Sequence, residues 1–295
     1  MADESLMLEA HRVLGTTCLF QGAFPAAQTH LDYAIRLYDP ERHRTHAFIY
    51  GQDPKVSALG YVAETLWLLG YPEKALTTSH ESLVFARELS HPLSLAYALN
   101  HAARLHLHRR EPHIAQQLVE SGNALCEEHG LAFWLAVGTF ERGWALCEQG
   151  QTEPGVQEMQ RGLAAFKACG TIHAPPHYLG RLAVAFGQRG DAKRAVTTLD
   201  EAITAVQETD ERLYEPELYR LRGEWLLKQS GHGGEEVEVA FRRALEVSRR
   251  QSAQSWQLRA AMSLSRLWKH REKRAEARAL VGEAYSWFTE GFDTT

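Results

Sequence analysis

The hydrophobic pattern of residues 182–206 predicts two short amphipathic helices in succession. Apolar positions including Phe186 share one face of the first helix, which we expect to end at Gly190, because a residue without a Cβ atom readily adopts the left-handed conformation. Asp191 is placed to cap the second helix. That helix carries one apolar stripe at steps of three and four residues, made of Ala195, Leu199, Ala202, Ile203 and Val206.

This two-helix pattern recurs along the chain. A small residue lies one turn into each predicted second helix, at Ala27, Ala75, Ala115, Gly155, Ala195, Val237 and Ala277, with intervals of 48, 40, 40, 40, 42 and 40 residues. Five residues before each lies a predicted turn, at Gly22, Gly70, Arg110, Gly150, Gly190, His232 and Glu272. We therefore predict an all-α, right-handed α-solenoid of about seven helical hairpins, one superhelical domain over 1–295. The expected hairpins are about 7–38, 56–90, 93–129, 132–169, 175–208, 213–250 and 254–289.

Prolines agree with this register. Four of them begin predicted second helices, where a missing N–H costs nothing: Pro25, Pro72, Pro112 and Pro154. Three others lie between hairpins: Pro92, Pro175 and Pro176. Two places are irregular. Residues 39–55 read as a long connector, and residues 230–236 as a widened turn.

The repeat resembles the tetratricopeptide repeat (TPR), lengthened to about 40 residues. More specifically, IYGQDPKVSALGYVAETLWLLGYPEKAL (49–76), GLAFWLAVGTFERGWALCEQGQ (130–151), ERLYEPELYRLRGEWLL (211–227), SWQLRAAMSLSRLW (255–268) and KRAEARALVGEAYSWFTEGFDT (273–294) resemble the C-terminal repeat region of bacterial predicted-ATPase and adenylate-cyclase-like multidomain regulators. In that family the repeats follow an ATPase module, itself preceded by a class III cyclase or a DNA-binding domain. This chain departs from that family's pattern in having only the repeats.

Composition indicates a folded, non-membrane protein. The chain is 44% hydrophobic, which suits a folded protein. Its formal net charge of −5 does not suit a general nucleic-acid binder. We expect it in the cytoplasm because neither a membrane span nor a signal peptide is visible. The four cysteines are widely separated and form no CxxC pair, which predicts small buried residues rather than disulfides or a zinc ribbon: Cys18, Cys126, Cys147 and Cys169.

No catalytic pattern occurs. Phosphate-loop, GxGxxG, HExxH and GxSxG sequences are absent, and GHGG at 231–234 reads as a flexible turn beside two glutamates that repel anions. His106 and His108, two apart on a helix, point away from each other, so His101, His106, His108 and His113 read as partly exposed helix-end residues. We predict no enzyme, metal or cofactor site; any ATPase or cyclase activity belongs to other domains.

The concave wall of the solenoid is the predicted binding surface. First helices line this wall, and the residues placed there are Trp67, Tyr97, Asn100, Arg104, Phe140, Trp144 and Arg220. Aromatic anchors beside polar groups suit a peptide or helix from a protein partner. The alternative is that these aromatic residues fill space between adjacent hairpins. The leading function is a scaffold or sensor segment of a signalling regulator; the alternative is a regulatory region that senses a small ligand for a cyclase or ATPase.

Two further features concern surfaces. Residues 242–274 hold ten Arg and Lys against two Glu, which indicates either a docking face for an acidic partner or nucleic acid, or, as we prefer, solvated helix faces. Both ends of the chain are apolar, from Met7 and Leu8 to Trp287 and Phe292. Since solenoids need polar end caps, these ends predict continuation into another domain, self-association, or a tail that folds back.

Overall fold

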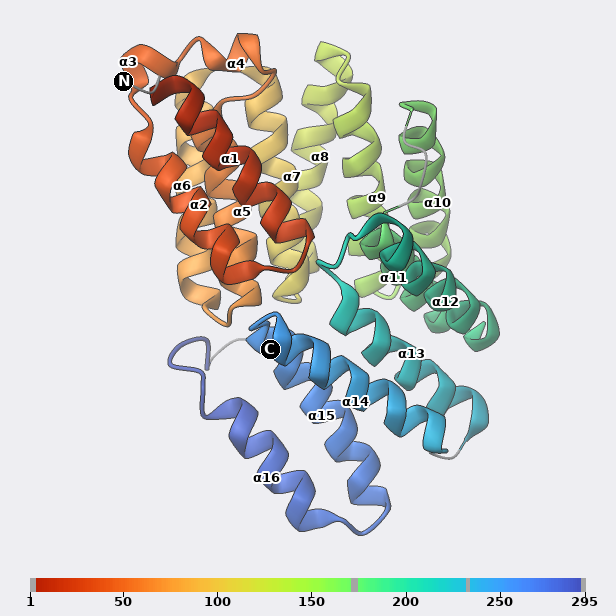
Figure 1. Cartoon of the computed structure of the whole chain (residues 1–295). Coiled ribbons are helices and arrows are strands. Elements are labelled where there is room, and N and C mark those ends of the chain that lie inside the picture. The colour runs from red at the N-terminus through yellow and green to blue at the C-terminus, as the bar shows by residue number, and fades with distance from the viewer. Residues whose placement is uncertain (1–3, 171–174, 232–233, 293–295) are drawn as a thin grey trace.

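The computed structural model describes residues 4–170, 175–231 and 234–292, and all regular structure in these ranges is helical. Consecutive helices form seven hairpins, which confirms the predicted fold class, an all-α helical-repeat solenoid (Figure 1). The pairs are α1 (Glu4–Phe20) with α2 (Phe24–Leu37), α5 (Pro54–Leu68) with α6 (Pro72–Leu89), α7 (Pro92–His108) with α8 (Pro112–His129), α9 (Ala132–Glu148) with α10 (Thr152–Ala168), α11 (Pro176–Gln188) with α12 (Ala192–Thr209), α13 (Glu215–Ser230) with α14 (Glu235–Arg250), and α15 (Gln254–His270) with α16 (Arg274–Tyr285).

The turns inside the hairpins share one backbone geometry. Gly190 has the expected left-handed φ of 95°, and Asp191 caps α12 by accepting a 3.0 Å hydrogen bond from the Arg194 amide. The predicted turn residues Arg110 and Glu272 are also left-handed, with φ of 61° and 63°, although neither is glycine. The repeat therefore imposes this turn even where the local sequence does not favour it. His232 and much of the predicted GHGG turn lie outside the described residues, and α13 ends at the left-handed Gly231.

The segment 39–55 connects the first two hairpins, as predicted, and it contains two single-turn helices that were not predicted, α3 (Pro40–His43) and α4 (His46–Ile49). Both helices form because they bury a histidine: His43 and His46 are 1% and 6% exposed, and His46 Nδ1 lies 2.9 Å from Glu9 Oε1 of α1. Asp53 then caps α5 by accepting hydrogen bonds from the amides of Lys55 and Val56. The connector is thus fastened at both ends to the first two hairpins.

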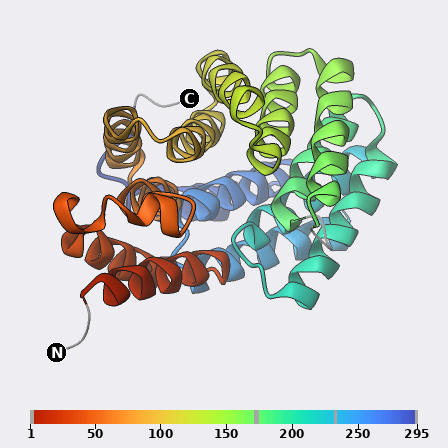
Figure 2. The ribbon, with the colours of Figure 1, turned by 90° about the horizontal axis from the view of Figure 1, so that it is seen from above.

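The solenoid curls until its first and last turns meet (Figures 1 and 2). The amides of Arg212 and Leu213, just before α13, donate to the carbonyl of Phe20 at the end of α1, at 2.6 and 3.1 Å. From α15, Trp256 packs edge-on against Trp67 of α5, with ring centroids 4.8 Å apart. One apolar core cluster consequently runs from Leu19 to Trp256. The concave side of the solenoid has become the interior of a closed ring.

The C-terminal segment also crosses to the second hairpin. We call residues 286–292 the strap. Trp287 packs against Tyr71 with centroids 5.1 Å apart, and Glu290 Oε1 accepts hydrogen bonds from the amides of Glu73 and Lys74 at 2.9 and 3.1 Å. Of the three expectations for the apolar ends, a tail that folds back is therefore observed for the C-terminal aromatic residues. It covers the start of α6.

Candidate functional site

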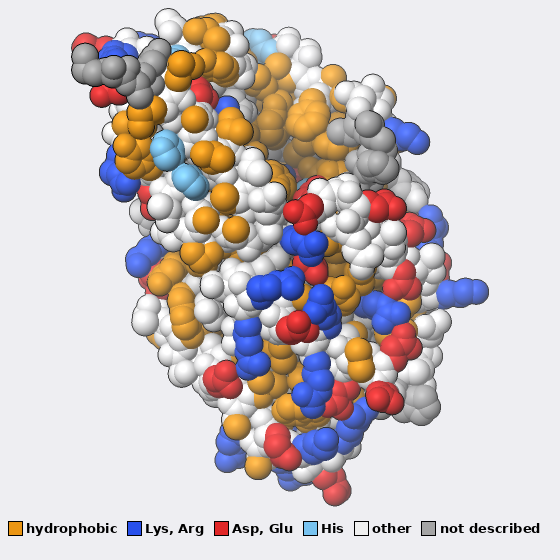
Figure 3. All heavy atoms as spheres, viewed as in Figure 1, with side chains coloured by type: hydrophobic (Ala, Val, Ile, Leu, Met, Phe, Trp, Pro, Cys, Tyr) orange, Lys and Arg blue, Asp and Glu red, His pale blue; other side chains and the backbone are white. Residues whose placement is uncertain are grey.

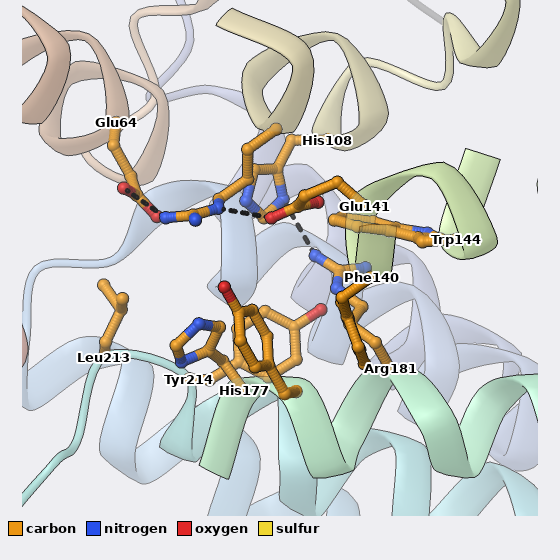
Figure 4. Close-up of a pocket in the computed structure, with 11 residues that line it drawn as sticks. Glu64, His108, Phe140, Glu141, Trp144, His177, Arg181, Leu213 and Tyr214 are labelled. Carbon is orange, nitrogen blue, oxygen red and sulfur yellow. Dashed lines mark hydrogen bonds and ion pairs between the residues drawn. The ribbon is translucent and has the colours of Figure 1, made fainter. Parts of the chain in front are cut away.

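The inner ends of the first helices converge on a small central pocket (Figure 4). Its volume is only about 10 Å³, because the lining side chains fill the space between them. Equivalent repeat positions supply much of it, since Glu64, Arg104 and Trp144 are 40 residues apart, as are Glu141 and Arg181. The lining residues are Glu64, Arg104, His108, Phe140, Glu141, Trp144, His177, Tyr178, Arg181, Leu213 and Tyr214.

Arg104 is the centre of a buried ionic group. Its Nε donates to Glu141 Oε1 at 2.9 Å, and its Nη1 lies 3.5 Å from Glu64 Oε2. Glu141 is 1% exposed and Arg104 9%. Burial opposes the charge of Arg104, but the two carboxylates outweigh it and hold the pKa of the guanidinium well above its ordinary value. Arg104 is thus paired on both sides, although Glu141 Oε2 is buried without a hydrogen-bond partner among the described residues.

Arg181 has a different environment. Its guanidinium lies 3.5 Å from the centre of the Trp144 ring and 4.6 Å from that of Tyr214, and its Nη2 lies 3.0 Å from His108 Nδ1. Within the described part of the chain, no carboxylate lies within ion-pair distance of it. Burial lowers the pKa of Arg181 below its ordinary value. A guanidinium that lies between aromatic rings without a carboxylate partner can bind an incoming anion, which would stabilise its charge.

His108 links this cation to the seam where the ring closes. Its ring stacks on Trp67 with centroids 4.3 Å apart, and its backbone carbonyl accepts a 3.0 Å hydrogen bond from Arg259 of α15. Burial first, and then Arg181 and Arg259, lower the pKa of His108 well below its ordinary value. The neutral imidazole can therefore accept a hydrogen bond from Arg181.

The seven residues predicted for the groove do not line one open groove: six of them are buried and the Arg220 side chain is 15% exposed. Arg104, Phe140 and Trp144 line the central pocket, and Trp67 stacks on His108 beside it. Arg220 is held in a separate ionic cluster by Glu217, with contacts of 2.6 and 2.7 Å. Ring closure explains this burial: the wall packs against itself.

Two of the aromatic residues follow the alternative prediction, that they fill space between adjacent hairpins. Tyr97 stacks on His101 and meets Trp134 of α9 edge-on, with centroids 4.3 and 4.9 Å apart. Phe140 stacks on Tyr178 of α11 at 4.3 Å. Asn100 is likewise buried, and its amide donates to the Ala96 carbonyl of its own helix at 2.9 Å. Tyr97 and Phe140 therefore join neighbouring repeats, α7 to α9 and α9 to α11.

Other sequence predictions need correction. His101 and His108 are 8% and 6% exposed, not partly exposed helix-end residues, because α7 packs against α5 and α9 and its end meets Trp256 of α15. Cys126 and Cys147 are buried as expected, whereas Cys169 is exposed at the end of α10. Sequence reasoning also missed Glu141 and Arg181. The signal was the 40-residue register itself, because both lie at the repeat position of His101.

The basic segment 242–274 consists of interleaved charged faces over α14 and α15, as we preferred (Figure 3). Seven of its ten cations lie within ion-pair distance of glutamates, among them Arg243 with Glu246 at 2.8 Å and Arg249 with Glu283 at 3.0 Å. Such pairing reduces the positive charge that this segment offers to nucleic acid. The described residues contain no cluster of His, Cys, Asp and Glu suited to a metal ion, and no described helix is long and apolar enough to cross a membrane.

Comparison with known proteins supports the fold more than a specific family. No family model matches the chain. An uncharacterised protein of Rhizobium meliloti (strain 1021) is 25% identical over 266 residues, which is 90% of this chain but 26% of that protein. The chain thus spans about a quarter of the length of this relative.

Among solved structures, the Rap conjugation gene regulator of plasmid pLS20 in complex with the Phr* peptide has a TM-score of 0.67 at 10% identity, covering 94% of this chain and 72% of that one. A Rap protein complexed with Competence and Sporulation Factor has a TM-score of 0.61 at 16% identity over 85% and 66% of the two chains. Aspartyl phosphate phosphatase F from Bacillus subtilis scores 0.59 at 12% identity over 96% and 70%. At these identities the likeness is one of fold, a TPR-like helical repeat.

Proposed function

We propose that this chain is a non-catalytic regulatory module that binds a peptide or an extended segment of a protein partner on its inner wall. The observation that carries the proposal is Arg181, a half-buried cation held between Trp144 and Tyr214 without a carboxylate partner in the described chain. A carboxylate of the partner would pair with Arg181, and the aromatic rings would receive apolar side chains. The Rap regulator of plasmid pLS20, solved in complex with the Phr* peptide, supports the class of ligand.

Binding on this wall requires the ring to open. A pocket of about 10 Å³ does not admit even one amino-acid side chain, so the structure is the closed form of the proposed module. The contacts that must separate are those of the seam, including Trp256 against Trp67 and Arg259 on the His108 carbonyl. A ligand that binds only the open form shifts the equilibrium toward it.

The multidomain context belongs to the same proposal. The resemblance to repeat regions of ATPase and cyclase-like regulators, and the match to about a quarter of a longer relative, both favour a repeat region that acts on other domains. In this setting the partner segment comes either from such a domain or from a separate protein in the same pathway.

The test is selection of binding peptides from a random display library, followed by fluorescence anisotropy. We expect selected peptides to carry a carboxylate, and Arg181→Met to weaken their binding at least tenfold, because one charge-assisted contact is lost. Arg161→Gln is the matched control, since Arg161 lies on α10 with its side chain 61% exposed. Small-angle scattering should show a larger radius of gyration with peptide bound.

Two results would contradict the proposal. Peptides that bind Arg181→Met as tightly as the wild type would remove Arg181 from the site, provided that circular dichroism shows the variant folded. ATP hydrolysis or cyclic nucleotide formation by the purified chain would show that the module is not purely a binding protein.

A further inference from the structure

A second cavity lies along the seam where the last hairpin and the strap close against α5, α6 and α7. Its volume is about 300 Å³, at the lower end of the range for small-molecule sites. The residues that matter here are Arg109 and Arg110 at the end of α7, Leu258, Arg259 and Met262 of α15, and Phe288 of the strap. We call this space the seam cavity. It shares His108 with the central pocket, and its other lining residues are different.

Positive charge dominates the polar lining of the seam cavity. Arg259 lies 3.4 Å from Glu217, but that carboxylate is already bound by Arg220 at 2.6 Å. Arg110 is exposed at the cavity rim, and the described chain places no carboxylate within ion-pair distance of it. Arg109 pairs with Glu111 and donates to the Pro72 carbonyl at 3.2 Å, which holds its guanidinium at the wall.

The carboxylate that the strap contributes does not neutralise these arginines. Glu290 lines the cavity, but its Oε1 accepts hydrogen bonds from the amides of Glu73 and Lys74, where the positive end of the α6 dipole stabilises it. An anion in the cavity would therefore find arginine donors rather than a competing internal carboxylate.

Apart from His108 and Ser255, the rest of the lining is mainly apolar or aromatic. Leu258 and Met262 face the cavity from α15, Phe288 from the strap and Trp67 from α5. Met262 is 40% exposed, so an apolar side chain of α15 is left partly in water beside the cavity. Apolar walls with a few convergent cations recognise a ligand that has an apolar body and one anionic group.

The strap forms one wall and is itself held by a reciprocal contact. Glu290 accepts from the Glu73 amide, while the Gly291 amide donates to Glu73 Oε1 at 2.9 Å. Gly291 lies close against α6: a Cβ atom there would come within 2.3 Å of Pro72 Cγ, and its φ is 79°. The wall of the cavity therefore exists only while the strap is docked.

We propose that the seam cavity binds a small carboxylate with an aromatic or aliphatic body, and that the docked strap closes over it. The carboxylate pairs with Arg110 and Arg259, and the body packs on Leu258, Met262 and Phe288. Because the site is complete only in the closed ring, ligand binding stabilises that form. This opposes the ring opening that a peptide on the inner wall requires.

The experiment is isothermal titration of the full chain with phenylacetate, with phenylacetamide and acetate as controls that lack the charge and the apolar body. We expect phenylacetate to bind and both controls to bind at least tenfold more weakly. Arg110→Gln should weaken phenylacetate about tenfold, the effect of one charge-assisted contact. Met262→Glu, at a partly exposed position, should abolish binding by repulsion. Arg161→Gln should change nothing.

Coupling to the strap has its own measurement. Gly291→Ala clashes with Pro72 without altering charge, so we expect weaker phenylacetate binding. In the wild type, phenylacetate should slow hydrogen exchange of the amides of residues 286–292. Absence of phenylacetate binding, or equal binding by Met262→Glu, overturns the site; unchanged affinity in Gly291→Ala overturns the closure. Arg181→Met should leave phenylacetate binding intact, which separates this test from that of the inner wall.

Discussion

Replacing Gly143 by alanine tests how closely the two helices of hairpin four pack. Alanine is ordinarily the better helix former by about 1 kcal/mol, which alone would make the change stabilising. A Cβ atom at position 143, however, would lie 2.6 Å from both the Gly155 carbonyl oxygen and the Met159 amide nitrogen of α10. Both are backbone atoms, so neither can rotate away, and α9 and α10 must separate.

The clash outweighs the propensity. Overpacking of this kind costs about 1–3 kcal/mol, and contact with two backbone atoms places Gly143→Ala near the upper limit, about 3 kcal/mol. After the gain of about 1 kcal/mol in helix propensity, we expect a net loss of about 2 kcal/mol. For a chain of 295 residues this corresponds to a fall of about 3 °C in Tm.

The assay is urea denaturation followed by circular dichroism, together with calorimetry. Gly282→Ala is the matched control, because Gly282 lies in α16 and a Cβ atom there would have no atom within 4 Å outside its own stretch of helix. We expect that change to raise the free energy of unfolding by about 0.5 kcal/mol. A neutral or stabilising effect of Gly143→Ala, like the effect expected for the control, would contradict the close approach of α9 and α10.

Two further predictions concern buried charge. His101 and His108 have pKa values well below 6.5 in the folded state, chiefly through burial, so the unfolded chain binds protons first as pH falls. The stability they contribute is present above pH 6.5, and each should lose about 1.4 kcal/mol per pH unit below it until its folded pKa is reached. Urea titrations at pH 7.5 and 5.5 should show a smaller loss in His108→Gln than in the wild type, whereas the exposed control His129→Gln should keep the wild-type loss. Separately, Glu141→Leu should cost about 3 kcal/mol by leaving Arg104 with only the more distant Glu64, and in a double-mutant cycle the double change Arg104→Met with Glu141→Leu should cost less than the sum of the two single changes; losses that add would show that the pair is not coupled.

The repeat architecture could be predicted because its signals are local. Helix periodicity, the proline positions and the turn five residues before each small residue all act within about 20 residues. Arg110 and Glu272 adopt the left-handed conformation although neither is glycine, so the repeat register predicts the turn positions better than the presence of glycine does. The two single-turn helices of 39–55 were missed because they depend on burial of His43 and His46 against α1 rather than on their own short sequences.

Whether the inner wall is open or packed against itself could not be predicted from such local signals. Ser255 Oγ donates to the Trp67 carbonyl across 188 residues, and Glu290 caps α6 across 217. Such contacts depend on the rotation added at each of seven repeats, and a small change in that rotation separates the two ends. The sequence therefore predicted an open groove lined by Trp67, Arg104 and Trp144, whereas all three side chains are buried in the structure.

The composition of this wall bears on how readily the ring opens. A permanently closed interior would be at least as stable with apolar residues as with buried ion pairs, because desolvation largely cancels the Coulomb attraction of such pairs. Here the wall holds Arg104 between Glu64 and Glu141, and Arg181 without a carboxylate within ion-pair distance in the described chain. On opening, these groups regain their hydration, whereas an apolar wall would expose surface to water at about 25 cal/mol per Å². The charged residues thus reduce the free-energy difference between the closed and open rings, so that a ligand needs only moderate preference for one form to select it.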